Sequence, residues 1–150
     1  MKLNLWPPAL IIQTDNPSIS TTQGFVVKLM KNAPAHMVAH ELWHVRQFWF
    51  LIGVGVAIAY GAHAATGYGA VLTPIAALPA LVFEFVTELD RRKEMAAYAE
   101  SVRQGRGLYG AALVASKYYN LPTKARSEIK ARREIEKRLP RRWWGGYALF

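Results

Sequence analysis

A long stretch without formal charge occupies the middle of this chain and limits how it can fold. Between Gln47 and Phe83 there is no Asp, Glu, Lys or Arg, and His63 is the single imidazole. Because most of the stretch is apolar, other protein or lipid must cover it. The glycine-rich break from Gly61 to Gly69 divides the stretch into two arms. The pattern therefore predicts a long apolar helical hairpin.

Three environments for this hairpin remain open from the sequence. A membrane-spanning helix needs roughly 20 apolar residues, which the first arm approaches if it extends to Tyr68. Cations stand at both ends of the hairpin, Arg46 on one side and residues 91–93 on the other, as expected if both ends lie on the positive side of a membrane. Pro74 and Pro79 break a straight helix and favour instead a domain core or a homo-oligomer contact.

The N-terminal part predicts a small sheet followed by a helix. Residues 1–35 are expected to be extended and loop structure, and the apolar run from Gly24 to Lys31 predicts a strand. Asn32 is the expected N-cap of the next helix, with Pro34 in its first turn. That helix begins near Ala35 and continues into the uncharged stretch.

The first turns of this helix carry the sequence His40-Glu41-Leu42-Trp43-His44. Residues four apart lie on one helical face with about 5–6 Å between their Cβ atoms, so the two imidazoles can converge on one metal ion. Glu41 is displaced from that face but can reach a water on the metal. The motif predicts zinc held by His40 and His44, with Glu41 as general base. The chain has no cysteine, so a metal must use His, Asp or Glu.

His36 extends the series of histidines by one more helical turn. It lies eight residues from His44, or about 12 Å along a helix. One ion cannot bind to both side chains without breaking the helix. We therefore expect His36 to contact the metal ligands without binding the metal, or to face the substrate.

A catalytic zinc needs a third protein ligand and an open position for water. A hairpin centred on Gly67 places residue 94 opposite residue 40, and residue 90 opposite residue 44. Glu94 is therefore the preferred third ligand, with Glu88 and Asp90 close behind it. The other carboxylates and imidazoles downstream are His63, Glu84 and Glu100.

Together, the His40-Glu41-x-x-His44 motif and the later segment Glu94-Met95-Ala96-Ala97-Tyr98 resemble the gluzincin type of zinc metallopeptidase, over about residues 24–104. The resemblance implies His40, His44 and Glu94 as zinc ligands and Glu41 as the base that activates water for hydrolysis of a peptide or protein substrate. The sequence departs from metzincins, which add a third histidine, and from intramembrane proteases with an Asn-Pro-Asp-Gly segment. An oxyanion donor is also expected, and Tyr98, Tyr109 and His36 are the candidates.

The C-terminal part carries most of the net charge of +9. Ten basic residues lie between Lys117 and Arg142. A helix from Lys124 to Leu139, capped by Thr123, is expected there. With the aromatic residues that follow, residues 117–144 could bind an anionic membrane surface or nucleic acid. A non-catalytic binding protein with a structural or vestigial metal site is therefore the alternative to an enzyme.

The expected fold is α+β and mostly helical. It consists of a minimal zincin-like metallopeptidase domain at residues 1–120, with a small N-terminal sheet and the apolar hairpin, and a basic helical and aromatic tail at residues 121–150. No secretory signal is evident at the start, where Pro7 and Pro8 interrupt the apolar run. We therefore expect a cytoplasmic or membrane-associated protein.

Overall fold

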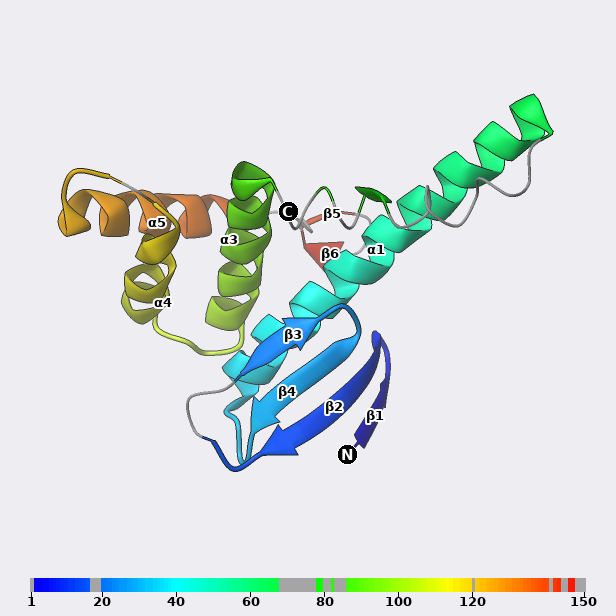
Figure 1. Cartoon of the computed structure of the whole chain (residues 1–150). Coiled ribbons are helices and arrows are strands. Elements are labelled where there is room, and N and C mark those ends of the chain that lie inside the picture. Colours follow the sequence, from blue (N-terminus) through cyan, green and yellow to red (C-terminus); the bar gives the residue numbers. More distant parts are fainter. Residues whose placement is uncertain are drawn as a thin grey trace.

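A computed structural model describes residues 2–16, 20–67, 78–79, 82, 86–119, 121–140, 142–143 and 146–147. A small sheet comes first in the chain, and helices make up most of the remainder (Figure 1). The predicted α+β class, mostly helical with a small N-terminal sheet, is confirmed.

The sheet has four strands in the order β1-β2-β4-β3. Its strands are β1 (Lys2–Leu5), β2 (Pro8–Thr14), β3 (Thr21–Gln23) and β4 (Val26–Met30). β2 and β4 are parallel, whereas β1 and β3 pair antiparallel to their neighbours. Because β3 is last in the strand order, it is an edge strand. Alternate residues of β4, Val27 and Leu29, are buried and pack with Val45 of the helix that follows. This contact attaches the sheet to that helix.

Helix α1 (Ala35–Thr66) carries the His40-Glu41-x-x-His44 motif in its first turns. The expectation that Asn32 caps it was wrong, because Pro34 is the N-cap residue and no side chain caps the helix. Asn32 instead adopts a left-handed backbone conformation with φ of 57° in the turn after β4. The helix ends where the glycine break predicts, since Gly67 adopts a φ of 74° and donates its N–H to the His63 carbonyl.

Three further helices form a second layer. They are α3 (Thr87–Arg103), α4 (Leu108–Ala115), followed by the short 3-10 helix η2 (Ser116–Tyr118), and α5 (Lys124–Arg138). Thr123 caps α5 as predicted, by accepting a hydrogen bond from the Arg126 N–H. Alanines at the helix contacts and larger side chains such as Met95 and Ile135 form one buried cluster that α3, α4 and α5 share. The C-terminal strands β5 (Arg142–Trp143) and β6 (Gly146–Tyr147) pair with each other.

The N-terminal half of α1 lies between the sheet and α3 (Figure 1). Val45 faces the sheet, while Trp43 packs on Ala96 and Ala97 of α3. The C-terminal half of α1 projects away from the other elements (Figure 1). The return arm expected at residues 70–85 lies almost entirely outside the described residues, and Glu84 is among those not described.

Candidate metal centre

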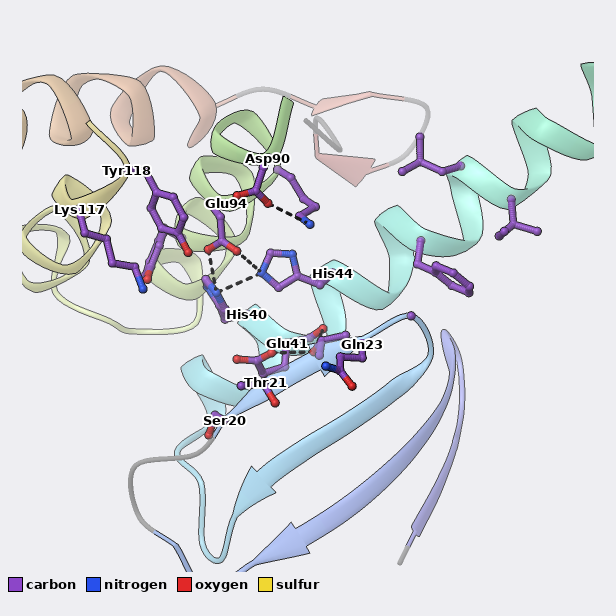
Figure 2. A pocket seen from close by; sticks show the side chains of 17 residues that line it. Ser20, Thr21, Gln23, His40, Glu41, His44, Asp90, Glu94, Lys117 and Tyr118 are labelled. Carbon is purple, nitrogen blue, oxygen red and sulfur yellow. Dashed lines mark hydrogen bonds and ion pairs between the residues drawn. The ribbon is translucent and has the colours of Figure 1, made fainter. Parts of the chain in front are cut away.

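Two histidines of α1 and one glutamate of α3 meet where these helices pack together (Figure 2). His40 Nε2 lies 3.3 Å from His44 Nε2. The Glu94 carboxylate presents one oxygen to each ring, 3.4 Å from His44 Nε2 and 3.7 Å from His40 Nε2. The register that placed residue 94 opposite residue 40 thus corresponds to a close approach of these side chains.

The spacing of these donor atoms suits a small tetrahedral cation. Ligands about 2.0–2.1 Å from a tetrahedral zinc ion are separated from one another by about 3.3–3.4 Å. The two imidazole nitrogens are 3.3 Å apart, which is close to that value, and one Glu94 oxygen lies 3.4 Å from His44 Nε2 while the other lies 3.7 Å from His40 Nε2. Two imidazoles and one carboxylate are also a donor set that leaves one zinc position open. The residues present could therefore hold a divalent metal ion such as zinc.

A buried glutamine fixes the orientation of one imidazole. Gln47 is fully buried, and its Nε2 donates to the Lys93 carbonyl at 3.1 Å. Its Oε1 is therefore the atom that faces His44 Nδ1, at 3.0 Å. Because that oxygen accepts, His44 Nδ1 carries the proton, and His44 Nε2 directs a lone pair towards His40 and Glu94.

Glu41 lies in the same cavity, held by the edge strand of the sheet. Its Oε2 accepts a hydrogen bond of 2.6 Å from the Thr22 hydroxyl of β3. Burial raises the pKa of Glu41 to about 7, with a smaller contribution from Glu94, while the Thr22 hydrogen bond opposes the rise. A carboxyl group with a pKa near neutrality is matched to accepting and returning a proton.

The electrostatics of the three donors favour a bound cation. Burial, and next the neighbouring His44, lower the pKa of His40 to about 3, so its ring is neutral at working pH. Burial also raises the pKa of Glu94, although His40 and a hydrogen bond from Tyr118 oppose this rise. The site thus offers a neutral His40 imidazole and poorly solvated carboxyl groups, whose ionised form a divalent cation would stabilise.

A cavity of about 730 Å³ opens beside the three donors. Residues 20–24 line one side of it, and α1 lines another from His40 to Ile52. Tyr98 and Tyr118 close the end near Glu94, and the Tyr98 ring lies 4.5 Å from the His40 ring. Burial raises the pKa of Tyr98 to about 12, so its hydroxyl keeps its proton and can donate. The cavity has room for a segment of polypeptide rather than for a water molecule alone.

The other residues singled out from the sequence have different places. Of the proposed oxyanion donors, Tyr98 lines the cavity, whereas His36 and Tyr109 are not among its lining residues. The His36 carbonyl accepts a hydrogen bond from Ser101, and Tyr109 is 69% exposed on α4. Asp90 lines the cavity but pairs with Lys93 at 3.1 Å.

The remaining carboxylates considered as third ligand are engaged elsewhere. Glu88 forms ion pairs with Arg91 and Arg92 on an exposed surface. Glu100 pairs with Arg103 at the other end of α3. Among the residues that the structure describes, Glu94 is the carboxylate grouped with the two histidines.

Sequence reasoning did not single out the residues that orient this site. Thr22 and Tyr118 lie in segments without a recognisable motif, and only the fold brings them to Glu41 and Glu94. Gln47 could have been found, because it follows His44 by three residues and therefore shares its helical face.

Comparison with protein-family models, with curated proteins and with solved structures gives no match to this chain.

Proposed function

We propose that this protein is a zinc-dependent hydrolase of peptide bonds. His40, His44 and Glu94 would hold the ion, and Glu41 would act as the general base. The observation that carries the proposal is the group of His40, His44 and Glu94, whose donor atoms lie within 4.8 Å of one another, next to a separate carboxylate in the same cavity. This arrangement combines a tetrahedral ligand set with a proton acceptor that is not itself needed as a ligand.

The residues of the chain divide the chemistry between them. When bound, zinc would supply a Lewis acid that polarises a carbonyl and acidifies water. Glu41 accepts a proton as the water oxygen attacks the carbonyl carbon, and delivers that proton to the amine nitrogen as the C–N bond breaks. Thr22 keeps the Glu41 carboxylate in place through its 2.6 Å hydrogen bond. The protonated Tyr98 hydroxyl is the candidate donor to the negative charge that develops on the carbonyl oxygen.

The edge of the sheet supports a peptide as the substrate. β3 is an edge strand, and its three residues line the cavity beside Glu41 (Figure 2). An edge strand offers unpaired backbone groups that an extended peptide can pair with. Such pairing would place successive peptide bonds along the cavity wall that carries Thr22. The same edge would offer little to a small amide without a backbone.

The test is the replacement Glu41→Gln, assayed on fluorescein-labelled casein with zinc content measured in the same samples. We expect a loss in kcat/KM of about 10²–10⁴-fold with zinc retained, because the general base is removed but all three ligands remain. Glu88→Gln is the matched control, since it neutralises an exposed carboxylate of α3 and should change neither quantity. Equal hydrolysis by wild type and Glu41→Gln would contradict the proposed role of Glu41.

A further inference from the structure

Apart from a face with the buried residues Leu51, Gly55 and Ala59, the second half of α1 exposes apolar side chains in the described part of the chain. In the most apolar 18-residue window of this helix, 17% of the residues are buried. Val56 is 52% exposed, Ile58 is 53% exposed and Tyr60 is 72% exposed. A helix in the core of a soluble domain would be mostly buried. A contiguous exposed apolar surface of this kind normally contacts a partner or a membrane.

The dimensions of this half match the interior of a bilayer. Residues 48–66 would be about 28 Å long at 1.5 Å per residue, close to the hydrocarbon thickness of about 30 Å. They contain no Asp, Glu, Lys or Arg. Cations begin just before this segment in the sequence, since Arg46 of α1 is exposed two residues before Phe48. Because Gln47 donates to the Lys93 carbonyl, the run of cations at residues 91–93 lies at this same level. The exposed Arg46 at that level suits anionic headgroups, whereas residues 91–93 also pair with Glu88 and Asp90.

A collar of exposed apolar side chains surrounds the base of the projecting helix. We define the collar as Leu5, Trp6, Phe25 and Trp49. The Trp49 ring nitrogen donates to the Pro8 carbonyl at 2.8 Å, and the Trp49 and Phe25 rings lie 6.3 Å apart. Trp49 belongs to α1, and the β1–β2 and β3–β4 connections, next to which Leu5, Trp6 and Phe25 stand in the sequence, lie on the side from which α1 projects (Figure 1).

The collar is too exposed to serve as protein core. Leu5 is 81% exposed, Trp6 is 80% exposed and Phe25 is 46% exposed. Tryptophan and other aromatic residues are enriched where a protein meets the interface between headgroups and hydrocarbon. An aromatic collar at the point where an uncharged helix leaves a charged body is the arrangement expected at a membrane surface.

We infer that residues 48–66 of α1 insert into a lipid bilayer and that the collar rests at its surface. The candidate metal centre then lies just outside the membrane, because His44 is one helical turn before residue 48. The cavity extends from the metal centre to Leu51 and Ile52, which belong to the inserted half. Provided that the proposed peptidase function holds, the substrate is a polypeptide segment at the membrane surface, such as the juxtamembrane part of a membrane protein.

The experiment is flotation of the full chain with vesicles of phosphatidylcholine, with and without phosphatidylglycerol. We expect the protein to float with both and to stay bound after a high-salt wash, because insertion depends on apolar contact rather than on charge alone. Ile58→Lys should weaken partitioning about a hundredfold, since a cation within the hydrocarbon is costly.

Ile129→Lys is the matched control, because Ile129 is 52% exposed on α5 and Ile58 is 53% exposed on α1. The control should float as the wild type does. Equal weakening by both lysines would overturn the inference. So would a wild-type chain that stays in the soluble fraction as a discrete dimer without binding vesicles, since a second copy would then cover the apolar face.

Zinc content separates this inference from the proposed function. Ile58 does not line the cavity, so Ile58→Lys should keep the zinc of the wild type while losing flotation. Glu41→Gln should float normally while losing hydrolysis. Failure of flotation with hydrolysis intact would overturn the membrane inference alone, and failure of hydrolysis with flotation intact would overturn the peptidase proposal alone.

Discussion

A single chain of hydrogen bonds orients the His44 ring, running from the Lys93 carbonyl through Gln47 to His44 Nδ1. Replacing Gln47 with alanine removes the acceptor that selects the tautomer of His44 and leaves a buried space. We predict that zinc affinity falls about 10–100-fold, which is the usual cost of losing such a partner of a metal ligand. Competition with a chelator of known affinity measures the zinc affinity of the variant and of the wild type.

Gln104→Ala is the control for this prediction. The Gln104 side chain also donates a hydrogen bond, to the Glu100 carboxylate, but it lies at the far end of α3. Its replacement should leave zinc affinity unchanged. An equal loss in both variants would show that the Gln47 effect is a general loss of stability rather than a loss of His44 orientation.

The protonation of Glu41 makes the stability of the metal-free protein depend on pH. Burial raises the pKa of Glu41 from 4.5 to about 7, so the folded protein retains a proton that the unfolded chain has released. Folding stability therefore falls as pH rises from about 4.5 to about 7, and this contribution is constant above that range. Glu41→Gln removes the titration. Its stability relative to wild type should increase across that window by on the order of 3 kcal/mol.

Urea unfolding in the presence of a chelator, at several pH values, measures this difference. Thr22→Val provides a second comparison, because it removes a hydrogen bond that lowers the Glu41 pKa. The fall in stability should then extend to higher pH than in the wild type. A constant difference between Glu41→Gln and wild type from pH 4.5 to 8 would contradict a raised Glu41 pKa.

At this scale the sequence predicts the grouping of His40, His44 and Glu94 better than it predicts the residues around them. Helical geometry alone places His40 and His44 on one face, and the position of the glycine break points to Glu94. Thr22 and Tyr118 were not predictable, because their approach depends on how the sheet and η2 pack against α1 and α3. Long-range packing of this kind leaves no local periodicity in the sequence.

The contact between α1 and α3 determines whether the ligands can meet. Trp43 packs on Ala96 and Ala97, and both alanines are essentially without exposed surface. These small side chains allow the two helix backbones to approach closely. We predict that Ala97→Leu destabilises the fold by about 1–3 kcal/mol through overpacking and also weakens zinc binding, because it moves Glu94 away from the histidines.

Ala112→Leu is the matched substitution at a contact remote from the metal. Ala112 is 2% exposed, in the cluster shared by α3, α4 and α5. It should lower stability by a similar amount, as measured by urea unfolding, but leave the zinc affinity of the folded protein unchanged. Equal zinc affinities in the two variants would argue against a role for the α1–α3 spacing.

Capping and helix-breaking residues in the sequence predicted where helices begin and end, but no feature of the sequence predicted the strand order of the small sheet. Thr123 and the glycine break that contains Gly67 mark helix ends that the structure reproduces. The prediction of Asn32 as N-cap was wrong, because asparagine is suited both to capping a helix and to the left-handed backbone conformation that Asn32 adopts. The strand order was not predictable, because β2 and β4 are direct neighbours in the sheet although β3 lies between them in the sequence.

In the whole molecule, the candidate metal centre joins parts of the fold that are distant in sequence. The sheet, α1 and α3 each contribute to one cavity, so a bound ion should stabilise their arrangement. At a free zinc concentration a hundredfold above Kd, the folded state gains about 2.7 kcal/mol, or about 5–10 °C in Tm for a chain of this size. Thermal unfolding with zinc and with chelator measures this shift, and Glu94→Ala should reduce it strongly.

The most direct test of the account is the zinc content of the purified wild-type protein and of His44→Ala, Glu94→Ala and Glu88→Ala. The account predicts about one zinc ion per chain in wild type and in Glu88→Ala, and little in the other two variants, because a two-ligand site binds zinc poorly. Wild-type protein without zinc, or undiminished zinc in either His44→Ala or Glu94→Ala, would contradict it.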